Sequence, residues 1–120
     1  MSLMDTPNAQ FLERYLDLAA YRQTLIAANV ANIDTPGYRT RDVAFHSELE
    51  WASFDNFQSP LRPFVRPVYG LMERPDGNNV SLERESLLLA DTQMRFNTAV
   101  QLLRDRFKML SSAIHEGSTS

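Results

Sequence analysis

The chain contains no cysteine, which excludes disulfides and thiolate metal sites and leaves the redox compartment undetermined. Its two histidines, His46 and His115, lie far apart in the sequence and match no metal-ligand spacing. Glycine-rich phosphate loops and nucleophile elbows are also missing. These absences predict a protein that is not an enzyme, with no catalytic residues, no cofactor, no metal ion and no small-molecule substrate.

Long apolar runs and clusters of one charge are lacking as well. The longest uninterrupted apolar stretch, residues 87–90, is far too short for a transmembrane segment. Twelve basic residues stand against 15 acidic ones, for a net charge of −3, and no basic cluster indicates nucleic-acid binding. The N-terminus has no basic start followed by an apolar core, which predicts the absence of a cleavable signal peptide.

A strong helical periodicity is present near each end of the chain. Between residues 7 and 33, alternating steps of four and three residues meet almost only apolar side chains, as in the seam of a coiled coil. Thr6 is a suitable N-cap residue, and Pro7 suits the first helical position because it lacks an N–H. The seam residues predicted on this helix are Leu12, Leu16, Ile26, Val30 and Ile33.

The same periodicity predicts a second helix over residues 81–116. Ser81 is a suitable N-cap residue, and Gly117 is expected to end the helix. Each helix also carries a second apolar stripe beside its seam, which one partner helix is too narrow to cover. The seam residues predicted on the second helix are Leu89, Phe96, Val100, Leu103, Phe107, Leu110 and Ile114.

The middle of the chain, residues 34–80, is expected to be short and irregular. Phe45 and Leu49 suit a short helix, and one short strand is expected within residues 64–71. Trp51 and its aromatic neighbours are interpreted as cover for the helix stripes, not as a ligand pocket. Residues 75–77 predict a tight turn, and residues 76–79 lack the ligand spacing of a calcium loop. The predicted fold class is all-α, a coiled-coil-like hairpin of two long terminal helices.

The most specific stretch of sequence is ANVANIDTPGY, residues 28–38. Pro36-Gly37 predicts a turn with positive φ at the glycine, directly after the helix ends at Asn32 or Ile33. Asn29 and Asn32 lie three residues apart on one helix face. Two interpretations stay open: the asparagines simply end a helix, or the Asn29 amide bonds a neighbouring backbone in an assembly.

This stretch resembles the signature of the flagellar rod, hook and hook-associated axial proteins, which has an Asn-x-x-Asn-x-x-Thr-Pro-Gly-Tyr core. The residues that carry the resemblance are Asn29, Asn32, Thr35, Pro36, Gly37 and Tyr38. Residues 39–45 and 76–85 are similar to the proximal rod subunits in particular, through Asp76, Gly77 and Asn78. Large β-rich inserts, typical of the distal rod and hook proteins, have no counterpart here.

The resemblance implies a single rod-type domain over residues 1–120 that polymerises through its terminal helices into part of a hollow, torque-transmitting drive shaft. It implies, as partners, copies of the same chain, other rod subunits, the membrane-ring adaptor protein and the flagellar type III export apparatus. The implied location is the periplasmic rod of the basal body, reached without a cleaved signal peptide. The competing hypothesis is a soluble helical-hairpin adaptor or chaperone that binds a partner through an exposed apolar stripe.

Overall fold

The computed structural model describes residues 6–119. Within these residues the elements follow one another as α1 (Pro7–Ala31), β1 (Arg41–Val43), α2 (Phe45–Ser53), β2 (Val65–Pro67) and α3 (Leu82–Thr119). The first five residues, on which the prediction about a signal peptide partly depends, lie outside the described residues.

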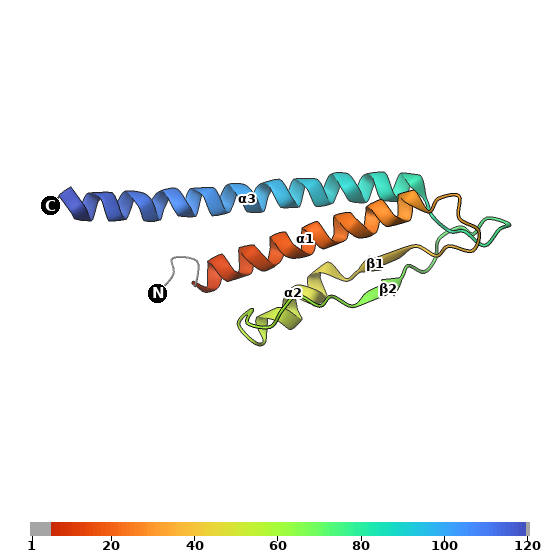
Figure 1. Ribbon diagram of the computed structural model, residues 1–120, viewed down its shortest axis with the longest axis horizontal. Helices are drawn as coiled ribbons and strands as arrows, with labels where there is room; N and C mark the ends of the chain where they lie inside the picture. Colours follow the sequence, from red (N-terminus) through yellow and green to blue (C-terminus); the bar gives the residue numbers. More distant parts are fainter. Residues whose placement is uncertain (1–5, 120) are drawn as a thin grey trace.

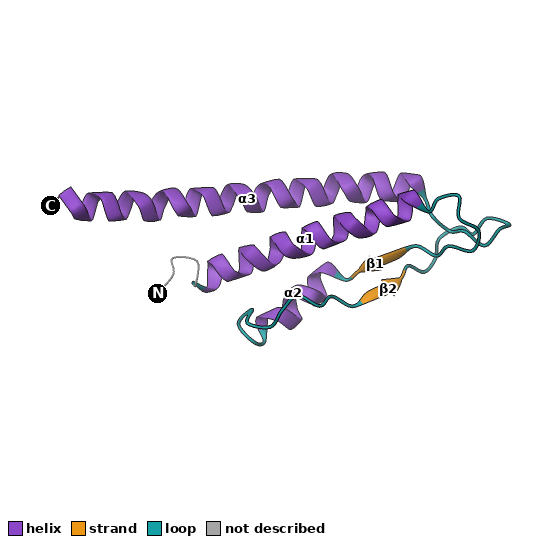
Figure 2. Cartoon of the chain, in the orientation of Figure 1, coloured by secondary structure: helices purple, strands orange, loops and turns teal. Residues whose placement is uncertain are grey.

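The molecule is elongated, with principal extents of 72 × 26 × 18 Å. Figure 1 shows α1 lying between α3 on one side and a layer of α2, β1 and β2 on the other, and α1 contacts elements of both. Figure 2 shows how little of the chain is strand. The predicted hairpin of two long terminal helices with a short middle segment is therefore confirmed.

Local signals set the start of both long helices. The Thr6 hydroxyl accepts a hydrogen bond from the Ala9 N–H at 3.3 Å, with Pro7 in the first turn. The Ser81 hydroxyl accepts from the Arg84 N–H at 3.2 Å and caps α3 in the same way. Both N-cap predictions are confirmed.

The end of α1 agrees with the prediction and the end of α3 does not. α1 ends at Ala31 with Asn32 as its C-cap, one of the two residues predicted to end it, although the periodic pattern extends to residue 33. The Asn32 side-chain amide donates to the Ala28 carbonyl at 2.8 Å. α3 continues through Gly117 to Thr119, so the predicted stop at Gly117 is wrong. A glycine weakens a helix but ends it only where it adopts positive φ, and Gly117 does not.

The middle segment holds one strand more than predicted. α2 contains Phe45 and Leu49, and β2 falls inside the predicted strand region. The additional strand is β1, which pairs antiparallel with β2, with Asp42 opposite Arg66. Three residues are too few to show the alternation that marks a strand in a sequence.

The apolar core is small and lies between α1, α2 and α3. Leu18, Ala19 and Phe45 are buried in it, and the Tyr15 and Phe45 rings meet edge to face at 4.9 Å. The expectation that the aromatics of the middle segment cover the helices is only partly right. Trp51 is 72% exposed, and its ring lies against that of the likewise exposed Phe54 at 5.7 Å.

The predicted seam of α1 lies largely at the contact with α3. Ile26 is buried, Leu12, Leu16 and Ile33 are half-buried, and Val30 is 37% exposed. Gln23, a polar residue at one position of this seam, donates a hydrogen bond to Gln93 of α3 at 2.9 Å.

On α3 the phase of the predicted seam is shifted. The fully buried residues of α3 are Thr92, Ala99 and Glu85, which form the row of side chains next to the predicted seam. The prediction that the seam is covered within the chain is therefore wrong for Leu89, Phe107 and Ile114, which are 45%, 57% and 60% exposed. Counting along the sequence in heptad steps finds the most apolar row of side chains. α1 instead packs against the neighbouring row, because its small side chains allow the two helices to approach closely. The remaining seam residues of α3 are half-buried, namely Phe96, Val100, Leu103 and Leu110.

Candidate functional site

Two turns lie against each other where the chain leaves α1 and where it enters α3. We call residues 32–40 and 74–80 together the joint. In the first turn the Tyr38 N–H donates to the Thr35 carbonyl at 3.2 Å, with Pro36 and Gly37 (φ +75°) between them, as predicted. In the second turn Gly77 has a φ of +86° and donates to the Arg74 carbonyl at 2.9 Å, which confirms the turn predicted at 75–77.

Backbone hydrogen bonds fasten the two turns together. The Gly37 N–H donates to the Asp76 carbonyl at 2.8 Å, and the Asn79 N–H donates to the Tyr38 carbonyl at 3.3 Å. A Cβ atom on Gly77 would lie 3.4 Å from the Gly37 Cα, so the two glycines allow the backbones to approach.

Two fully buried asparagines fill the space between the turns. The Asn78 amide donates to the carbonyls of Asn32 and Thr35 at 2.9 and 2.8 Å, in addition to the backbone hydrogen bonds that these carbonyls accept within the first turn. The Asn79 side-chain oxygen accepts from the Thr40 N–H at 2.7 Å. The joint is therefore a hydrogen-bonded cluster that fastens the two turns together at the end of the hairpin.

Asn29 is buried on α1 and forms four hydrogen bonds within the chain. Its amide nitrogen donates to the Arg41 carbonyl at 2.9 Å and to the Glu85 carboxylate at 3.2 Å. Its oxygen accepts from the Tyr38 hydroxyl at 2.9 Å and from the Arg41 N–H at 3.2 Å. The interpretation that the asparagines end the helix is confirmed for Asn32, the C-cap of α1, but not for Asn29, which lies within the helix. The interpretation that the Asn29 amide bonds a neighbouring backbone in an assembly stays a prediction. Within the chain, the Asn29 side chain ties α1 to β1 and α3.

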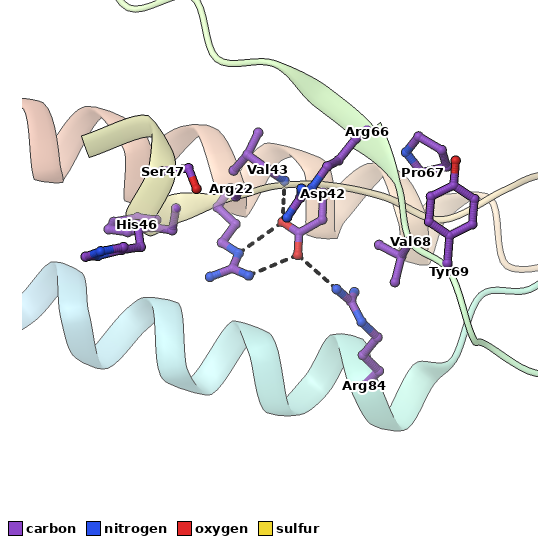
Figure 3. Close-up of a pocket in the computed structure, with 12 residues that line it drawn as sticks. Arg22, Asp42, Val43, His46, Ser47, Arg66, Pro67, Val68, Tyr69 and Arg84 are labelled. Atoms are coloured by element: carbon purple, nitrogen blue, oxygen red, sulfur yellow. Dashed lines mark hydrogen bonds and ion pairs between the residues drawn. The ribbon is translucent and has the colours of Figure 1, made fainter. Parts of the chain in front are cut away.

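Alternating charges on three elements lie beside Asn29, and Figure 3 shows three of them, Arg22, Asp42 and Arg84. Arg22 of α1 forms a bidentate pair with Asp42 of β1, with N···O distances of 3.0 and 2.9 Å. Arg84 of α3 bonds the same Asp42 carboxylate at 2.9 Å and the buried Glu85 carboxylate at 2.7 Å. We call these four residues the charge clamp.

The partners of Asp42 keep its carboxylate ionised. Burial alone would raise the pKa of Asp42. The hydrogen bonds from Arg22 and the Val43 N–H, the charge of Arg22 and the hydrogen bond from Arg84 outweigh burial and hold this pKa below its ordinary value. A buried ion pair of this kind fixes geometry more than it adds stability, because desolvation offsets much of the attraction.

Three residues of the charge clamp, Arg22, Asp42 and Arg84, line a hollow of about 610 Å³ together with residues of β1, β2 and the start of α2. His46 lies at its edge but is exposed and pairs with Glu50 at 2.7 Å. Among residues 6–119 no group of three or more histidine or acidic side chains is placed to hold a metal ion. In the same residues no helix has the length and apolarity needed to cross a bilayer.

The structure thus brings the motif residues together. Asn32, Thr35 and Gly37 contact residues 76–78 at the joint, and Asn29 is connected to them through Tyr38. Of the predicted seam, Ile33 lies in the joint, whereas Phe107 and Ile114 lie on the distant part of α3. The clamp was not predicted as a unit. The available signal was the resemblance of residues 39–45 and 76–85, which contain Asp42, Arg84 and Glu85 but do not show that they touch.

The sequence is similar to known proteins over almost all of its length. The family model "Flagella basal body rod protein" matches residues 16–39, from the middle of α1 to the first turn of the joint. The flagellar basal body rod proteins FlgB of Salmonella typhimurium and of Escherichia coli are each 30% identical, over 91% of this chain and 94% of theirs. That of Borrelia hermsii is 30% identical over 84% of this chain and 90% of its own. The chain therefore belongs to the FlgB family of flagellar basal body rod proteins, which are structural proteins and not enzymes.

Proposed function

We propose that this rod protein acts as one rod-type unit that polymerises through α1 and α3 with its own copies and other rod subunits. In this proposal it builds part of the proximal rod, a hollow shaft that transmits torque. One observation carries the proposal, namely that large apolar side chains of α3 are left exposed by the other residues in the described range 6–119. They are Leu82, Leu87, Leu89, Met94, Leu102, Phe107, Met109 and Ile114.

This exposed surface is unusual for a protein that works alone. Soluble monomers carry single exposed apolar residues, whereas a long apolar stripe marks an interaction surface. Each fully buried large apolar side chain contributes about 1.5–3 kcal/mol. The exposed side chains of α3 form two rows on different sides of the helix, namely Leu82, Leu89, Phe107 and Ile114, and Leu87, Met94, Leu102 and Met109. Packing α3 between neighbouring helices would bury much of both rows. The seam residues Leu89, Phe107 and Ile114 would supply the contacts of the first row.

The joint has an indirect part in this proposal. Its hydrogen bonds and the charge clamp fix α1 and α3 relative to each other, so that each subunit offers the same surface to its neighbours. The motif residues Asn29, Asn32, Gly37 and Asn78 then support assembly from inside the subunit. A shaft under torque requires such repeated, unchanging contacts.

We further propose, from the family resemblance, that the chain crosses the inner membrane unfolded through the flagellar type III export apparatus, without a cleaved signal peptide. It would then join the periplasmic rod beside the membrane-ring adaptor protein. The small core and the lack of cysteine suit this route, because no disulfide has to be opened for threading and little apolar area is disrupted.

Phe107→Asp tests the polymerisation proposal. A carboxylate at this 57% exposed site leaves the isolated chain folded but places a charge in the proposed helix contact. We expect motility in soft agar and the yield of basal bodies to fall about tenfold or more, as expected when a charge is buried unpaired. Arg104→Ala, an exposed site whose charge has no ion-pair partner among the described residues, is the control with a much smaller effect. Normal basal bodies with Phe107→Asp, or their formation without this chain, would refute the proposal.

A further inference from the structure

Three large aromatic side chains of the middle segment are exposed. Trp51, Phe54 and Phe64 are 72%, 81% and 73% exposed, and the rings of Trp51 and Phe54 lie 5.7 Å apart. The Glu48 carboxylate accepts the Phe64 N–H at 2.9 Å, and Trp51 follows Glu48 by one turn of α2. We call Trp51, Phe54 and Phe64 the aromatic patch. Single exposed apolar residues are ordinary, whereas several together mark an interaction surface.

The loop after α2 fixes the aromatic patch to α1. Phe57 packs edge to face on Phe11 of α1, with ring centroids 5.9 Å apart, and Arg14 of α1 donates to the Ser59 carbonyl. Phe57 has a φ of +61°, a strained conformation for a bulky residue. This conformation places Phe57 on α1 and leaves Phe54 outside. The patch is therefore positioned before any partner binds.

Two arginines without ion-pair partners lie beside the aromatic patch. Arg62, Phe64 and Arg66 are exposed at alternate positions, as expected on one side of an extended segment. Arg62 and Trp51 line the same hollow of about 140 Å³. The described residues provide neither arginine with a carboxylate, because those of α2 accept hydrogen bonds from the Phe64 N–H and from His46. The complement of this surface is therefore apolar and acidic.

The free edge of β2 does not accept a further strand. The Val68 N–H donates to the Thr40 carbonyl at 3.0 Å, so residues 66 and 68 face β1, and residues 65 and 67 face the free edge. Pro67 has no N–H to donate there, and proline blocks strand addition at an edge. A helix can still bind, because it requires only side-chain contacts.

We propose that the aromatic patch and its two arginines bind an acidic amphipathic helix of a rod subunit other than this chain. Apolar side chains of that helix pack on Trp51 and Phe54, and its carboxylates pair with Arg62 and Arg66. Aromatic and arginine side chains carry much of the binding energy in protein interfaces. The inference rests on the proposed function, which it deepens by naming the surface that meets a different subunit. Figure 1 shows α2 and β2 on the side of α1 opposite α3, so this surface is separate from the exposed rows of α3.

Neither a copy of the chain nor a membrane fits the patch. Two patches face to face would bring the arginines of both copies together, and repulsion disfavours this. A contact between the patch and another surface of a copy would repeat without limit, whereas the proposed shaft contains several kinds of subunit. An anionic membrane selects a cluster of basic residues. Residues 46–66 instead contain three acidic and two basic residues, which are Glu48, Glu50, Asp55, Arg62 and Arg66.

Photo-cross-linking in isolated basal bodies identifies what occupies the patch. With Trp51→p-benzoylphenylalanine, irradiation should join this chain to another rod protein, at a segment with acidic and apolar residues at helical spacing. The same photoreactive residue in place of Tyr69, an 83% exposed aromatic residue beyond β2, is the control and should not give this adduct. An adduct between two copies, an adduct with lipid, or no adduct from position 51 would overturn the inference.

Charge reversal tests the two arginines in cells that carry only the variant chain. Arg62→Glu with Arg66→Glu should lower the fraction of flagellated cells by roughly tenfold, because like charges then face each other. Arg62→Lys with Arg66→Lys keeps the charge and is the control, expected to retain most flagellated cells. Both isolated variants should unfold at the urea midpoint of the natural chain, because both sites are exposed. Normal flagellation after charge reversal would overturn this inference alone, whereas basal bodies that form without this chain would refute the proposed function.

Discussion

Replacing Asn29 with alanine removes the side chain that connects α1, β1 and α3. Asn29 is 1% exposed and forms four hydrogen bonds, with Tyr38, with Glu85 and with both backbone groups of Arg41. An unsatisfied buried polar group costs about 1–3 kcal/mol. Tyr38 is only half-buried and can turn to water, which leaves Glu85 and the Arg41 backbone as the main losses.

The magnitude follows from these losses and one gain. Alanine is the better helix former by about 0.6 kcal/mol, which partly offsets the lost hydrogen bonds. We expect the free energy of unfolding to fall by about 2–4 kcal/mol, the cost of roughly two unpaired buried groups. Urea unfolding of the full chain, followed by circular dichroism, measures this change.

Asn97→Ala is the matched control for this prediction. Asn97 is an exposed asparagine of α3 that accepts one hydrogen bond from Gln93 at 3.2 Å. The same substitution there is expected to leave stability unchanged or to raise it by a few tenths of a kcal/mol. Equal unfolding midpoints for Asn29→Ala and the natural chain would refute the assignment of Asn29 to the interior of the hairpin.

Two further predictions concern the clamp and the joint. Because its folded-state pKa is lowered, Asp42 contributes stability that is fully present above its ordinary value of 3.8 and is lost as the pH falls below it. Asp42→Asn should therefore flatten the dependence of stability on pH below about pH 4 and lower the free energy of unfolding by about 3 kcal/mol at neutral pH. Urea unfolding measured at several acidic pH values tests this, and an unchanged loss of stability at low pH would contradict it. Gly77→Ala should lower the free energy of unfolding by about 1–2 kcal/mol, because Gly77 has a positive φ and contacts Gly37. Gly117 is helical and has no neighbour within 4 Å of an added Cβ, so Gly117→Ala should raise the free energy of unfolding by about 0.5–1 kcal/mol. A higher melting temperature for Gly77→Ala than for Gly117→Ala would be contrary evidence.

The parts of the fold that the sequence predicted are those determined by neighbours in the chain. Thr6 and Ser81 cap helices a few residues away, and Pro36-Gly37 forms a turn whatever surrounds it. α2 follows from Phe45 and Leu49, one helical turn apart. None of these features requires a distant segment to be placed first.

The features that were missed depend on contacts far apart in the sequence. Arg22 lies 20 residues from Asp42, and Arg84 lies 42 residues from it, so the clamp exists only once α1, β1 and α3 have met. β1 is a strand only because β2 pairs with it. Asn29 shows the same limit, since a periodic pattern marks it as part of a helix face but not as a ligand of Glu85.

The shift between the predicted and the buried row of α3 separates the side chains that form the hairpin from those that stay exposed. α1 packs on Thr92 and Ala99, small side chains that permit close approach but bury little apolar area, while Phe107 and Ile114 remain outside. A chain selected to be stable alone would turn the large side chains inwards. Here the polar joint and the clamp fix the hairpin, and the proposed function assigns the large side chains to contacts between subunits. Stability gained only on assembly couples folding to polymerisation, because a bound neighbour stabilises the folded subunit by mass action. Substitutions at the joint should therefore weaken the subunit and the rod together, and substitutions on the exposed stripe should weaken the rod alone.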